Sequence, residues 1–254
     1  MGLDWSALSE TGRVRSVNED AFIHRDFGTV RVWAVADGMG GHRAGEVASR
    51  LALEAVTDAL ALVARQVEAG GRLSGRELKG AVLAAHRSVA EQSSQRPDLA
   101  GMGTTLTAAA IVRRTVLVGH VGDSRAYLFR GNLLEQLTTD HSVVEELRSA
   151  GLISRDEAMN HPHRNILTRA LGLPGPIRVD IVKRVVRRGD ILILCSDGLS
   201  GYVPPEAIAR TAASGLDAEA LAVELGRLAD GAGGQDNTTI VAVKIGPSGR
   251  RSGA

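Results

Sequence analysis

Short apolar runs rich in β-branched residues recur along the chain and predict β-strands. The runs cover residues 30–36, 104–112, 115–121, 126–129, 177–186, 191–195 and 238–245. Their lengths, and the Gly, Asp and Asn residues that border them, are typical of strands that end in turns.

Two long stretches, residues 45–67 and 75–92, instead carry apolar residues at close to every fourth position. This spacing gives each stretch one apolar face and predicts two amphipathic helices. Two shorter helices are predicted at residues 205–213 and 217–230, because the proline and aspartate at their starts often begin helices.

The predicted order is strands, two helices, many strands and two helices, without strict strand-helix alternation. A parallel doubly wound sheet needs that alternation, so we expect an α+β fold with antiparallel sheets face to face and helix pairs outside. Residues 138–175 are polar and contain two short helical patterns, at 142–150 and 155–159. We interpret this segment as a flap over a site; a plain surface excursion between strands is the alternative.

The composition excludes several classes of protein. The 254 residues are 44% hydrophobic and include one cysteine, so the core forms without an intrachain disulfide. Because Cys195 lies inside an apolar run, we expect a buried hydrophobic side chain, not a nucleophile, in a protein of the reducing cytoplasm. The formal net charge of +1 indicates neither a nucleic acid nor a membrane surface as partner.

The ends of the chain carry no targeting signal in this interpretation. The N-terminus lacks a basic start before an apolar stretch, so no signal peptide is expected. No apolar run approaches the roughly 18 residues of a membrane helix. Residues 246–254 are predicted to be a flexible tail after a single domain of residues 1–245.

Four aspartates stand where an apolar run meets a turn: Asp37, Asp123, Asp197 and Asp236. A strand end is rigid yet open to solvent, so carboxylates at such positions can converge on one ligand. Because like charges repel at short range, a cation must neutralise them, and hard oxygen ligands favour magnesium, manganese or calcium. Each Asp-Gly or Asp-Asn pair alone would only indicate a turn; four together favour a metal site.

A polar stretch near the N-terminus adds Arg15 beside the acidic pair Glu19 and Asp20. A guanidinium next to a metal site suits a bound phosphate, since its planar fork matches phosphate oxygens. A surface ion pair is the alternative for this stretch alone.

Taken in order, the motifs resemble the metal-dependent type 2C (PPM) serine/threonine protein phosphatases, bacterial branch. The resemblance covers about residues 4–245. It is carried by Arg15-x-x-Asn-Glu-Asp20, Asp37-Gly-Met-Gly-Gly-His42, Gly103-Thr-Thr105, Gly119-His-Val-Gly-Asp-Ser-Arg125, Leu137-Thr-Thr-Asp-His141, Leu167-Thr-Arg-Ala-Leu-Gly172, Cys195-Ser-Asp-Gly-Leu199 and Asp236-Asn237-Thr238.

The resemblance implies a four-layer α-β-β-α sandwich with two antiparallel sheets, helix pairs outside and a flap subdomain. It also implies two, and in bacterial members three, manganese or magnesium ions. Asp37 would bridge two of them, with the Gly38 carbonyl as a further ligand. Asp197 and Asp236 would complete the shell of the first ion.

Further roles follow from the same resemblance. Glu19 and Asp20 would act mainly through metal-bound waters. Asp123, together with Asp197, would hold a third and weaker ion. Arg15 would bind the substrate phosphate, and the flap would shape substrate choice.

The implied chemistry is hydrolysis of phosphoserine and phosphothreonine by a water that the cations activate. Arg15 and the cations would offset charge on the phosphate oxygens. Many eukaryotic members carry a histidine directly after the Asp-Gly pair as a proposed general acid, where this chain has Met39. The acid is therefore unassigned: His42 is the nearest candidate, and a metal-bound water is the rival.

Two further pairs of histidines are expected to be structural. His120 and His141 are predicted to tie strands or anchor the flap. For His161 and His163, on either side of a proline in the flap, a polar loop is favoured over a transition-metal site.

The sequence thus predicts a cytoplasmic, monomeric protein phosphatase. Its expected partners are phosphorylated proteins and an opposing eukaryotic-like serine/threonine kinase. A catalytically silent phosphatase-fold binding module stays open as an alternative, although such proteins lose metal ligands that this chain keeps. A phosphatase dedicated to one small regulator of the sigma-factor branch is the third hypothesis, and those chains usually carry sensor domains.

Overall fold

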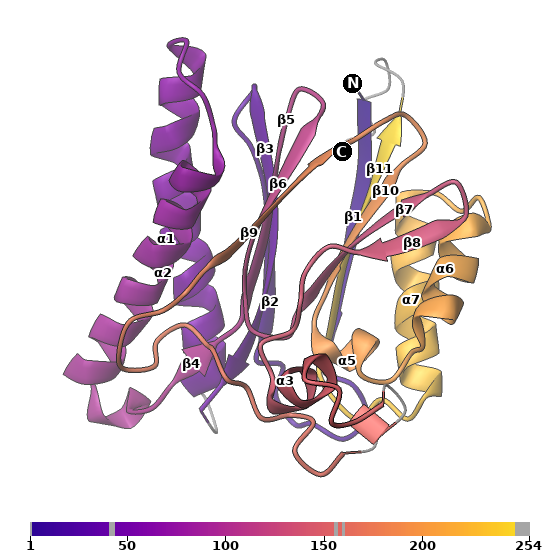
Figure 1. Cartoon of the computed structure of the whole chain (residues 1–254). Coiled ribbons are helices and arrows are strands. Elements are labelled where there is room, and N and C mark those ends of the chain that lie inside the picture. The colour runs from indigo at the N-terminus through magenta and orange to yellow at the C-terminus, as the bar shows by residue number, and fades with distance from the viewer. Residues whose placement is uncertain (1, 41–43, 155–156, 159–160, 247–254) are drawn as a thin grey trace.

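A computed structural model describes residues 2–40, 44–154, 157–158 and 161–246. Two antiparallel sheets lie face to face in its centre, with a pair of helices against each outer face (Figure 1). The expected α-β-β-α sandwich is therefore confirmed.

The first sheet has the strand order β1-β11-β10-β7-β8. Its strands are β1 (Gly2–Glu10), β11 (Thr238–Gly246), β10 (Ile191–Cys195), β7 (Arg125–Arg130) and β8 (Leu133–Gln136). The second sheet has the order β2-β3-β5-β6-β9, with β4 paired to the end of β3. Its strands are β2 (Asp20–Asp26), β3 (Val30–Met39), β4 (Gly103–Thr104), β5 (Leu106–Val112), β6 (Thr115–Val121) and β9 (Asp180–Val185).

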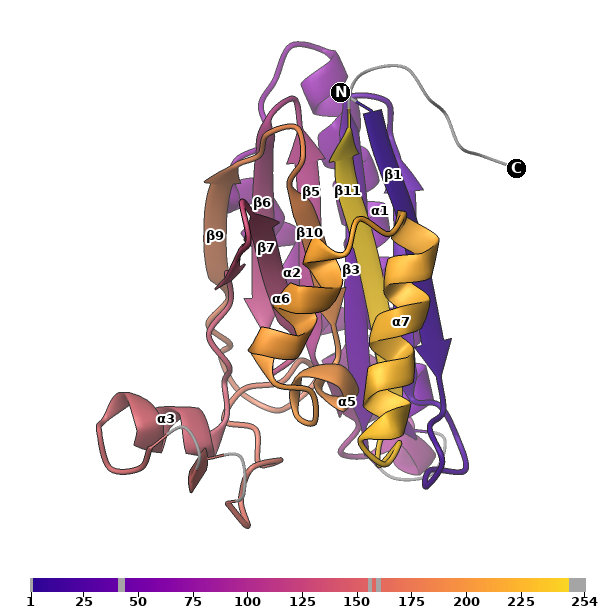
Figure 2. The same cartoon turned by 90° about the vertical axis from the view of Figure 1, so that its right-hand side faces the viewer.

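Long helices cover both outer faces (Figures 1 and 2). Helices α1 (Ala44–Glu68) and α2 (Gly75–Gln95) pack on the second sheet, and α6 (Pro205–Ala213) and α7 (Ala218–Gly231) pack on the first. The four predicted helices are confirmed and differ only at their ends. Three short helices complete the described elements: η1 (Pro97–Leu99), α3 (Val143–Ser149) and α5 (Asp197–Ser200).

Apolar side chains form three buried layers because successive residues of a strand point to opposite faces of its sheet. In β10, Leu192 and Leu194 belong to the layer between the sheets, together with Trp33. Ile193 and Cys195 belong to the layer under α6 and α7. Both faces of such a strand are buried, so it reads as a continuous apolar run. The buried, free thiol of Cys195 agrees with its expected role in the core.

Three strands were missed from the sequence, namely β1, β2 and β8. Each lies at the edge of its sheet and is largely half-buried or exposed, so polar residues interrupt its pattern. The predicted strand at residues 104–112 is divided into β4 and β5, and the one at 177–186 is limited to β9.

The flap segment, residues 138–175, leaves the sandwich between β8 and β9 and carries α3 (Figure 2). Helix α3 confirms the pattern at residues 142–150. The pattern at residues 155–159 falls mostly outside the described part of the chain. Among the described residues, no helix combines the length and apolar character that crossing a membrane requires.

Because the layer between the sheets is fully buried, the effect of a Leu→Ala substitution on stability should depend strongly on its position. Leu194 is fully buried there, whereas Leu62 on α1 is 61% exposed. Leu194→Ala should lower the free energy of unfolding by about 2–5 kcal/mol, because it leaves a cavity in a packed core. Leu62→Ala should change it by no more than about 0.5 kcal/mol. Equal losses for both variants in denaturant unfolding would contradict this arrangement of the core.

Candidate metal centre

Five aspartates that are distant in sequence meet at one end of the sandwich. Burial raises the pKa of Asp37 well above its usual value, and the charges of Asp20, Asp197, Asp123 and Asp236 raise it further, in that order. Such mutual effects require short distances. Asp20, Asp123, Asp197 and Asp236 are therefore all neighbours of Asp37.

The sequence pattern placed Asp37 at the end of its strand, and this prediction is wrong. Strand β3 continues to Met39, because Gly38 and Met39 pair with the short strand β4. Asp37 thus stands directly opposite Asp20 of β2. Like charges in such a cross-strand pair destabilise a sheet unless something neutralises them.

Two threonines hold the backbone of Asp37 in place. The hydroxyl of Thr104 donates to the Asp37 carbonyl oxygen at 2.8 Å, and the Thr105 amide donates to the same oxygen at 2.9 Å. The Asp37 amide in turn donates to the Thr105 hydroxyl at 2.9 Å. That hydroxyl lies 2.7 Å from the hydroxyl of Ser124, next to Asp123. The Gly103-Thr-Thr105 motif thereby links two of the aspartates.

Glycines permit close backbone approach on both sides of the centre. A Cβ atom on Gly38 would overlap the carbonyl oxygen of Gly45, at the start of α1. A Cβ atom on Gly198 would overlap the carbonyl oxygen of Asn237. Only glycine fits positions where backbone meets backbone in this way. The glycine after Asp37 and the glycine after Asp197 therefore bring neighbouring segments against the carboxylates.

Arg15 lies beside the carboxylates, on the loop between β1 and β2. Its Nη2 donates to Asp236 Oδ2 at 2.7 Å, and its side chain is 48% exposed. One predicted metal ligand is thus ion-paired with the predicted phosphate-binding residue. Because a guanidinium has five N–H donors, most of Arg15 stays free to bind an anion from solvent.

Asn237 organises this loop, a role that the sequence did not reveal. Its side-chain amide donates to the carbonyl oxygens of Thr11 and Val17, both at 2.9 Å. Its side-chain oxygen accepts from the Glu19 amide at 2.9 Å. Asn237 therefore fixes the segment that carries Arg15 and Glu19 against the start of β11. These bonds join residues about 220 positions apart, which sequence spacing does not indicate.

The carboxylates are electrostatically costly in the cation-free protein. Burial, only partly offset by a hydrogen bond from Ser196, raises the pKa of Asp20 to about 7. Burial and then the charge of Asp236 raise the pKa of Asp197 to about 6. Burial also raises the pKa of Asp123 and, less strongly, that of Glu19. Each value reflects the cost of placing negative charge where water is scarce.

Several carboxylate oxygens lack a partner. Glu19 Oε1, Asp20 Oδ1 and Asp197 Oδ1 are buried, and none has a hydrogen bond among the described residues. Buried acceptors without donors are rare in folded proteins and indicate a missing ligand. The donors are all oxygens, which suits a hard cation.

The carboxylates are nevertheless not arranged as a closed cage. Among the described residues, no three His, Cys, Asp or Glu side chains surround a single point closely enough to bind one ion. The mutual pKa effects show that they are neighbours all the same. Magnesium usually takes one or two protein carboxylates and keeps several waters. The residues present therefore fit a water-rich site better than an all-protein cage.

His42 lies outside the described residues, so the structure does not place this candidate general acid. His120 and His141 are structural, as expected. His120 contacts the hydroxyl of Thr107 at 2.9 Å and the carbonyl oxygen of Thr139, at the root of the flap, at 3.1 Å. Burial lowers the pKa of His120 to about 3. The Gly122 amide donates to His141 Nδ1 at 3.0 Å.

Known proteins resemble this chain in sequence and in fold. A family model described as protein phosphatase 2C matches residues 11–230. The serine/threonine phosphatase stp of Listeria monocytogenes is 39% identical over 244 residues, which are 93% of each chain. The crystal structure of the Mycobacterium tuberculosis serine/threonine phosphatase PstP/Ppp has a TM-score of 0.86 at 39% identity, covering 96% of this chain and 99% of that one. A crystal structure of the PstP catalytic domain in complex with two manganese ions has a TM-score of 0.81 at 37% identity, over 96% and 99% of the chains.

The raised pKa values predict an unusual dependence of stability on pH. In the folded, cation-free protein Asp197 and Asp20 keep their protons up to about pH 6 and 7. In the unfolded chain they lose them near pH 4. Between these values the folded state binds more protons, so the free energy of unfolding falls as pH rises.

In chelator, Tm should therefore drop from about pH 5 to about pH 8, by roughly 2–4 °C for each kcal/mol lost. Manganese should restore Tm more at the higher pH. Asp20→Asn should weaken the dependence of Tm on pH. Asp98→Asn, which changes an exposed ion pair with Arg96, should leave this dependence as it is in the wild type. A Tm that stays level or rises in chelator would contradict the burial of these carboxylates.

Proposed function

The chain belongs to the protein phosphatase 2C family and is a manganese- or magnesium-dependent protein serine/threonine phosphatase, and from this premise we propose which residues hold its cations and substrate. The observation that carries the proposal is the group of buried, partly unpartnered carboxylates beside Arg15.

We assign Asp37 to both cations of a pair, with the Gly38 carbonyl oxygen as a further ligand. Asp197 and Asp236 would complete the shell of the first cation together with waters, since the three carboxylates do not close around one point by themselves. When bound, the cations lower the pKa of the attacking water and offset negative charge on the phosphate. The PstP catalytic domain, which is similar in fold, is described in complex with two manganese ions.

The remaining carboxylates act around this pair. Glu19 and Asp20 face it and hold the waters that complete the cation shells, which accounts for their unpartnered oxygens. Asp123, with Asp197, holds a third and weaker cation. The Thr105–Ser124 contact, which joins the segments of Asp37 and Asp123, supports this neighbouring position.

Arg15 binds the phosphate of the substrate. Its half-exposed guanidinium lies at the edge of the cluster of carboxylates and is ion-paired with one of them, Asp236. A planar fork of donors can hold two phosphate oxygens at once and stabilise the charge that develops on them. The loop geometry that Asn237 imposes keeps this fork beside the cations.

The departing serine or threonine oxygen needs a proton. His42 remains one candidate donor and solvent at the cation site the other. Substitution of His42 distinguishes the two, because only loss of the true acid removes the alkaline limb of the pH–rate profile.

We place the enzyme in the cytoplasm, as a monomer that acts on phosphorylated proteins and opposes a eukaryotic-like serine/threonine kinase. Its domain spans residues 1–245 with the flap at residues 138–175, followed by a tail at residues 246–254. A binding module without catalysis is not favoured, since every matched carboxylate is present. A dedicated role against one small regulator stays distinguishable by phosphoproteomics after deletion of the gene.

Asp37 offers the sharpest test of the cation site. Asp37→Asn should lower kcat/KM by about 100-fold or more, because several kcal/mol of transition-state stabilisation depend on the cations. The assay is phosphate release from a phosphothreonine peptide with manganese, and calorimetric titration should show weakened manganese binding. Asp98→Asn, a surface substitution with the same chemical change, should keep the wild-type rate. Full activity of Asp37→Asn, or no phosphate release by folded, manganese-loaded wild type, would refute the proposal.

Cys195 separates this mechanism from that of thiol-dependent phosphatases. Its side chain is fully buried, and burial raises the pKa of its thiol to about 12, so it is neither accessible nor ionised at neutral pH. Iodoacetamide should leave the native enzyme active, whereas chelation should abolish activity that manganese then restores. Inactivation by alkylation of the folded protein would show that the thiol takes part.

A further inference from the structure

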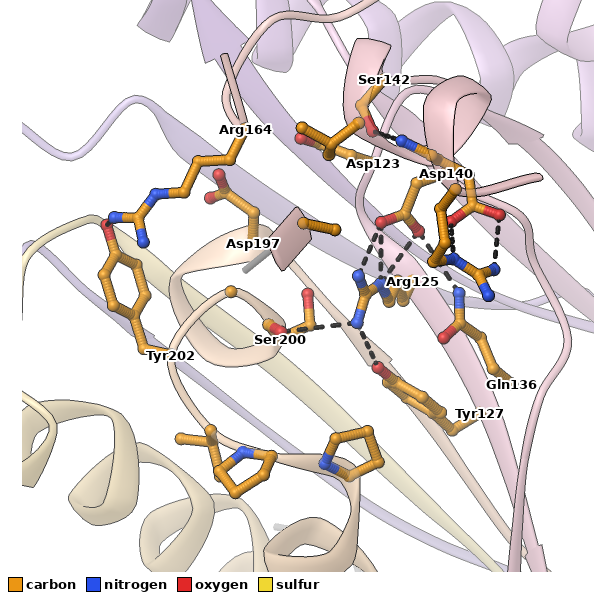
Figure 3. Close-up of a pocket in the computed structure, with 18 of the residues that line it drawn as sticks. Asp123, Arg125, Tyr127, Gln136, Asp140, Ser142, Arg164, Asp197, Ser200 and Tyr202 are labelled. Atoms are coloured by element: carbon orange, nitrogen blue, oxygen red, sulfur yellow. Dashed lines mark hydrogen bonds and ion pairs between the residues drawn. The ribbon is translucent and has the colours of Figure 1, made fainter. Parts of the chain in front are cut away.

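A cavity of about 450 Å³ lies between the flap segment and the connection from α5 to α6 (Figure 3). Sheet residues of β7 and β8, residues of α3 and residues 200–206 line it. Asp123 and Asp197, two of the proposed cation ligands, stand in its wall. This volume is in the range of ligand clefts, roughly 300–1,000 Å³. The cavity, named the flap cavity below, therefore opens directly onto the proposed catalytic centre.

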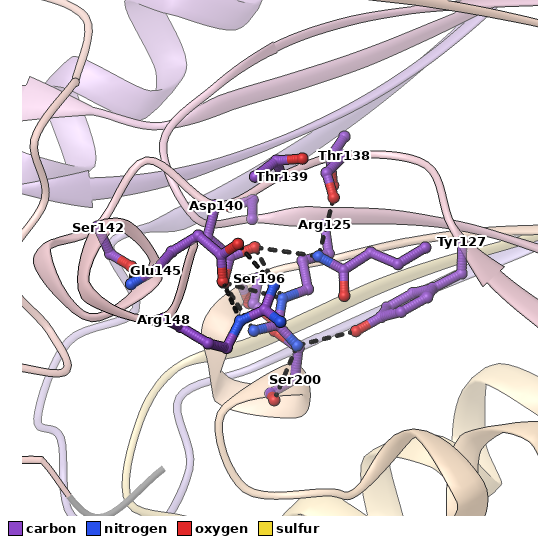
Figure 4. Close-up of polar contacts among 12 residues, drawn as sticks. Arg125, Tyr127, Thr138, Thr139, Asp140, Ser142, Glu145, Arg148, Ser196 and Ser200 are labelled. Atoms are coloured by element: carbon purple, nitrogen blue, oxygen red, sulfur yellow. Dashed lines mark hydrogen bonds and ion pairs between the residues drawn. The ribbon is translucent and has the colours of Figure 1, made fainter. Parts of the chain in front are cut away.

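An internal ion pair builds the back of the flap cavity (Figure 4). Arg125 Nε and Nη2 donate to the carboxylate of Asp140 at 2.6–3.1 Å. Arg125 Nη1 donates to the Tyr127 hydroxyl at 3.1 Å and to the Ser200 carbonyl oxygen at 3.4 Å. The Arg125 and Asp140 side chains are only 22% and 11% exposed. This network fixes the root of the flap against α5, so the cavity has a defined shape.

The other two arginines of the wall are also engaged. Arg148 donates to both oxygens of Glu145 at 2.6 and 2.7 Å. Arg164 lies over the ring of Tyr202, 5.1 Å from its centroid, and donates to its hydroxyl at 3.3 Å. A charged side chain would have to break one of these contacts, or compete with the cations proposed at Asp123 and Asp197, and would lose its own hydration. An uncharged guest meets neither cost.

Five apolar side chains supply a further part of the wall, beside polar residues such as Gln136 and Asn165: Leu134, Val144, Val203, Pro204 and Pro205. The five come from β8, from α3, from the segment before α6 and from the first residue of α6. Such a surface gains free energy when an apolar group displaces water from it. The paired arginines and the apolar part of the wall thus both favour an uncharged, apolar ligand.

We propose that the flap cavity binds an uncharged apolar side chain of the substrate, one or two residues from the phosphorylated serine or threonine. The inference rests on the proposed function, because that function places the phosphoester beside Asp123 and Asp197. An extended peptide advances about 3.3–3.6 Å per residue, so a near neighbour of the phosphoresidue reaches the adjoining cavity. The cavity is then a determinant of which phosphoproteins the enzyme prefers.

Phosphothreonine peptides with Leu, Ala, Asp or Lys at each of the four nearest positions test the proposal on the wild-type enzyme. At one of these positions Leu should exceed Ala in kcat/KM by about tenfold, a usual value for one apolar pocket. Asp and Lys should not exceed Ala there. Equal values for all peptides, or a preference for Asp or Lys, would overturn the proposal.

Val144→Trp tests the location by filling the cavity from α3. It should reduce the Leu-to-Ala ratio to less than about twofold, while turnover of the Ala peptide and of p-nitrophenyl phosphate stays within about twofold of wild type. Val223→Trp, at a 54% exposed position of α7, is the matched control and should keep the full ratio. A folded Val144→Trp enzyme that retains the leucine preference would refute the location.

Failure of the inference and failure of the proposed function give different results. If p-nitrophenyl phosphate is not hydrolysed with manganese, the proposed catalytic site is wrong. Fluorescence anisotropy with labelled Leu and Ala phosphopeptides then still decides on the cavity. Tighter binding of the Leu peptide supports it, and equal binding overturns it. If Val144→Trp has a lowered Tm, Val144→Asp takes its place, because a charge on that wall should likewise remove the leucine preference.

Discussion

Repulsion among buried carboxylates is the constraint on which the open end of the sandwich depends. Asp20 and Asp37 stand opposite each other across two strands, and Asp197 lies near both. Burial, and then the charges of the neighbouring aspartates, raise their pKa values. The backbone holds them there nevertheless, through Thr104 of β4, through Thr105 directly after it and through glycines that allow strands and helices to approach closely. The fold thus holds negative charges close together, and this arrangement favours the binding of cations.

Much of this fold could be predicted from sequence because its interior strands are buried on both faces. Strand β10 shows why: Leu192 and Leu194 face one layer and Ile193 faces another, so no polar residue interrupts the run. Edge strands such as β8 have no such signature, since one side meets water. The end of β3 was misjudged for a related reason. Its continuation to Met39 depends on pairing with two residues of β4, a tertiary contact that leaves no mark on local pattern.

The candidate site likewise combines features that the sequence predicts with features that depend on tertiary contacts. The aspartates after apolar runs could be predicted as candidate ligands because hard cations prefer oxygen ligands. Arg15 could be predicted as a candidate phosphate-binding residue because its planar fork of donors matches phosphate. Asn237 and Thr105 lie in motifs that carry the resemblance, but their roles could not be predicted, since those roles are hydrogen bonds to distant segments. The flap cavity was also beyond prediction. Its character follows from which charges already have partners, and pairs such as Arg125 with Asp140 become visible only in three dimensions. The sequence therefore indicated the chemistry, and the geometry of the flap cavity is the basis for the proposed substrate preference.

The pairing of β1 with β11 has a consequence for biosynthesis. Gly2 lies beside Gly246 and Glu10 beside Thr238, so the first strand of this fold is synthesised long before the strand with which it pairs. Asn237, which anchors the Arg15 loop, and Asp236 are made at almost the same late moment. Contacts between such remote segments form slowly. A nascent chain therefore contains its flap segment and both long helices before the residues that hold the Arg15 loop in place, and the proposed catalytic centre is completed only with the last part of the fold to be synthesised.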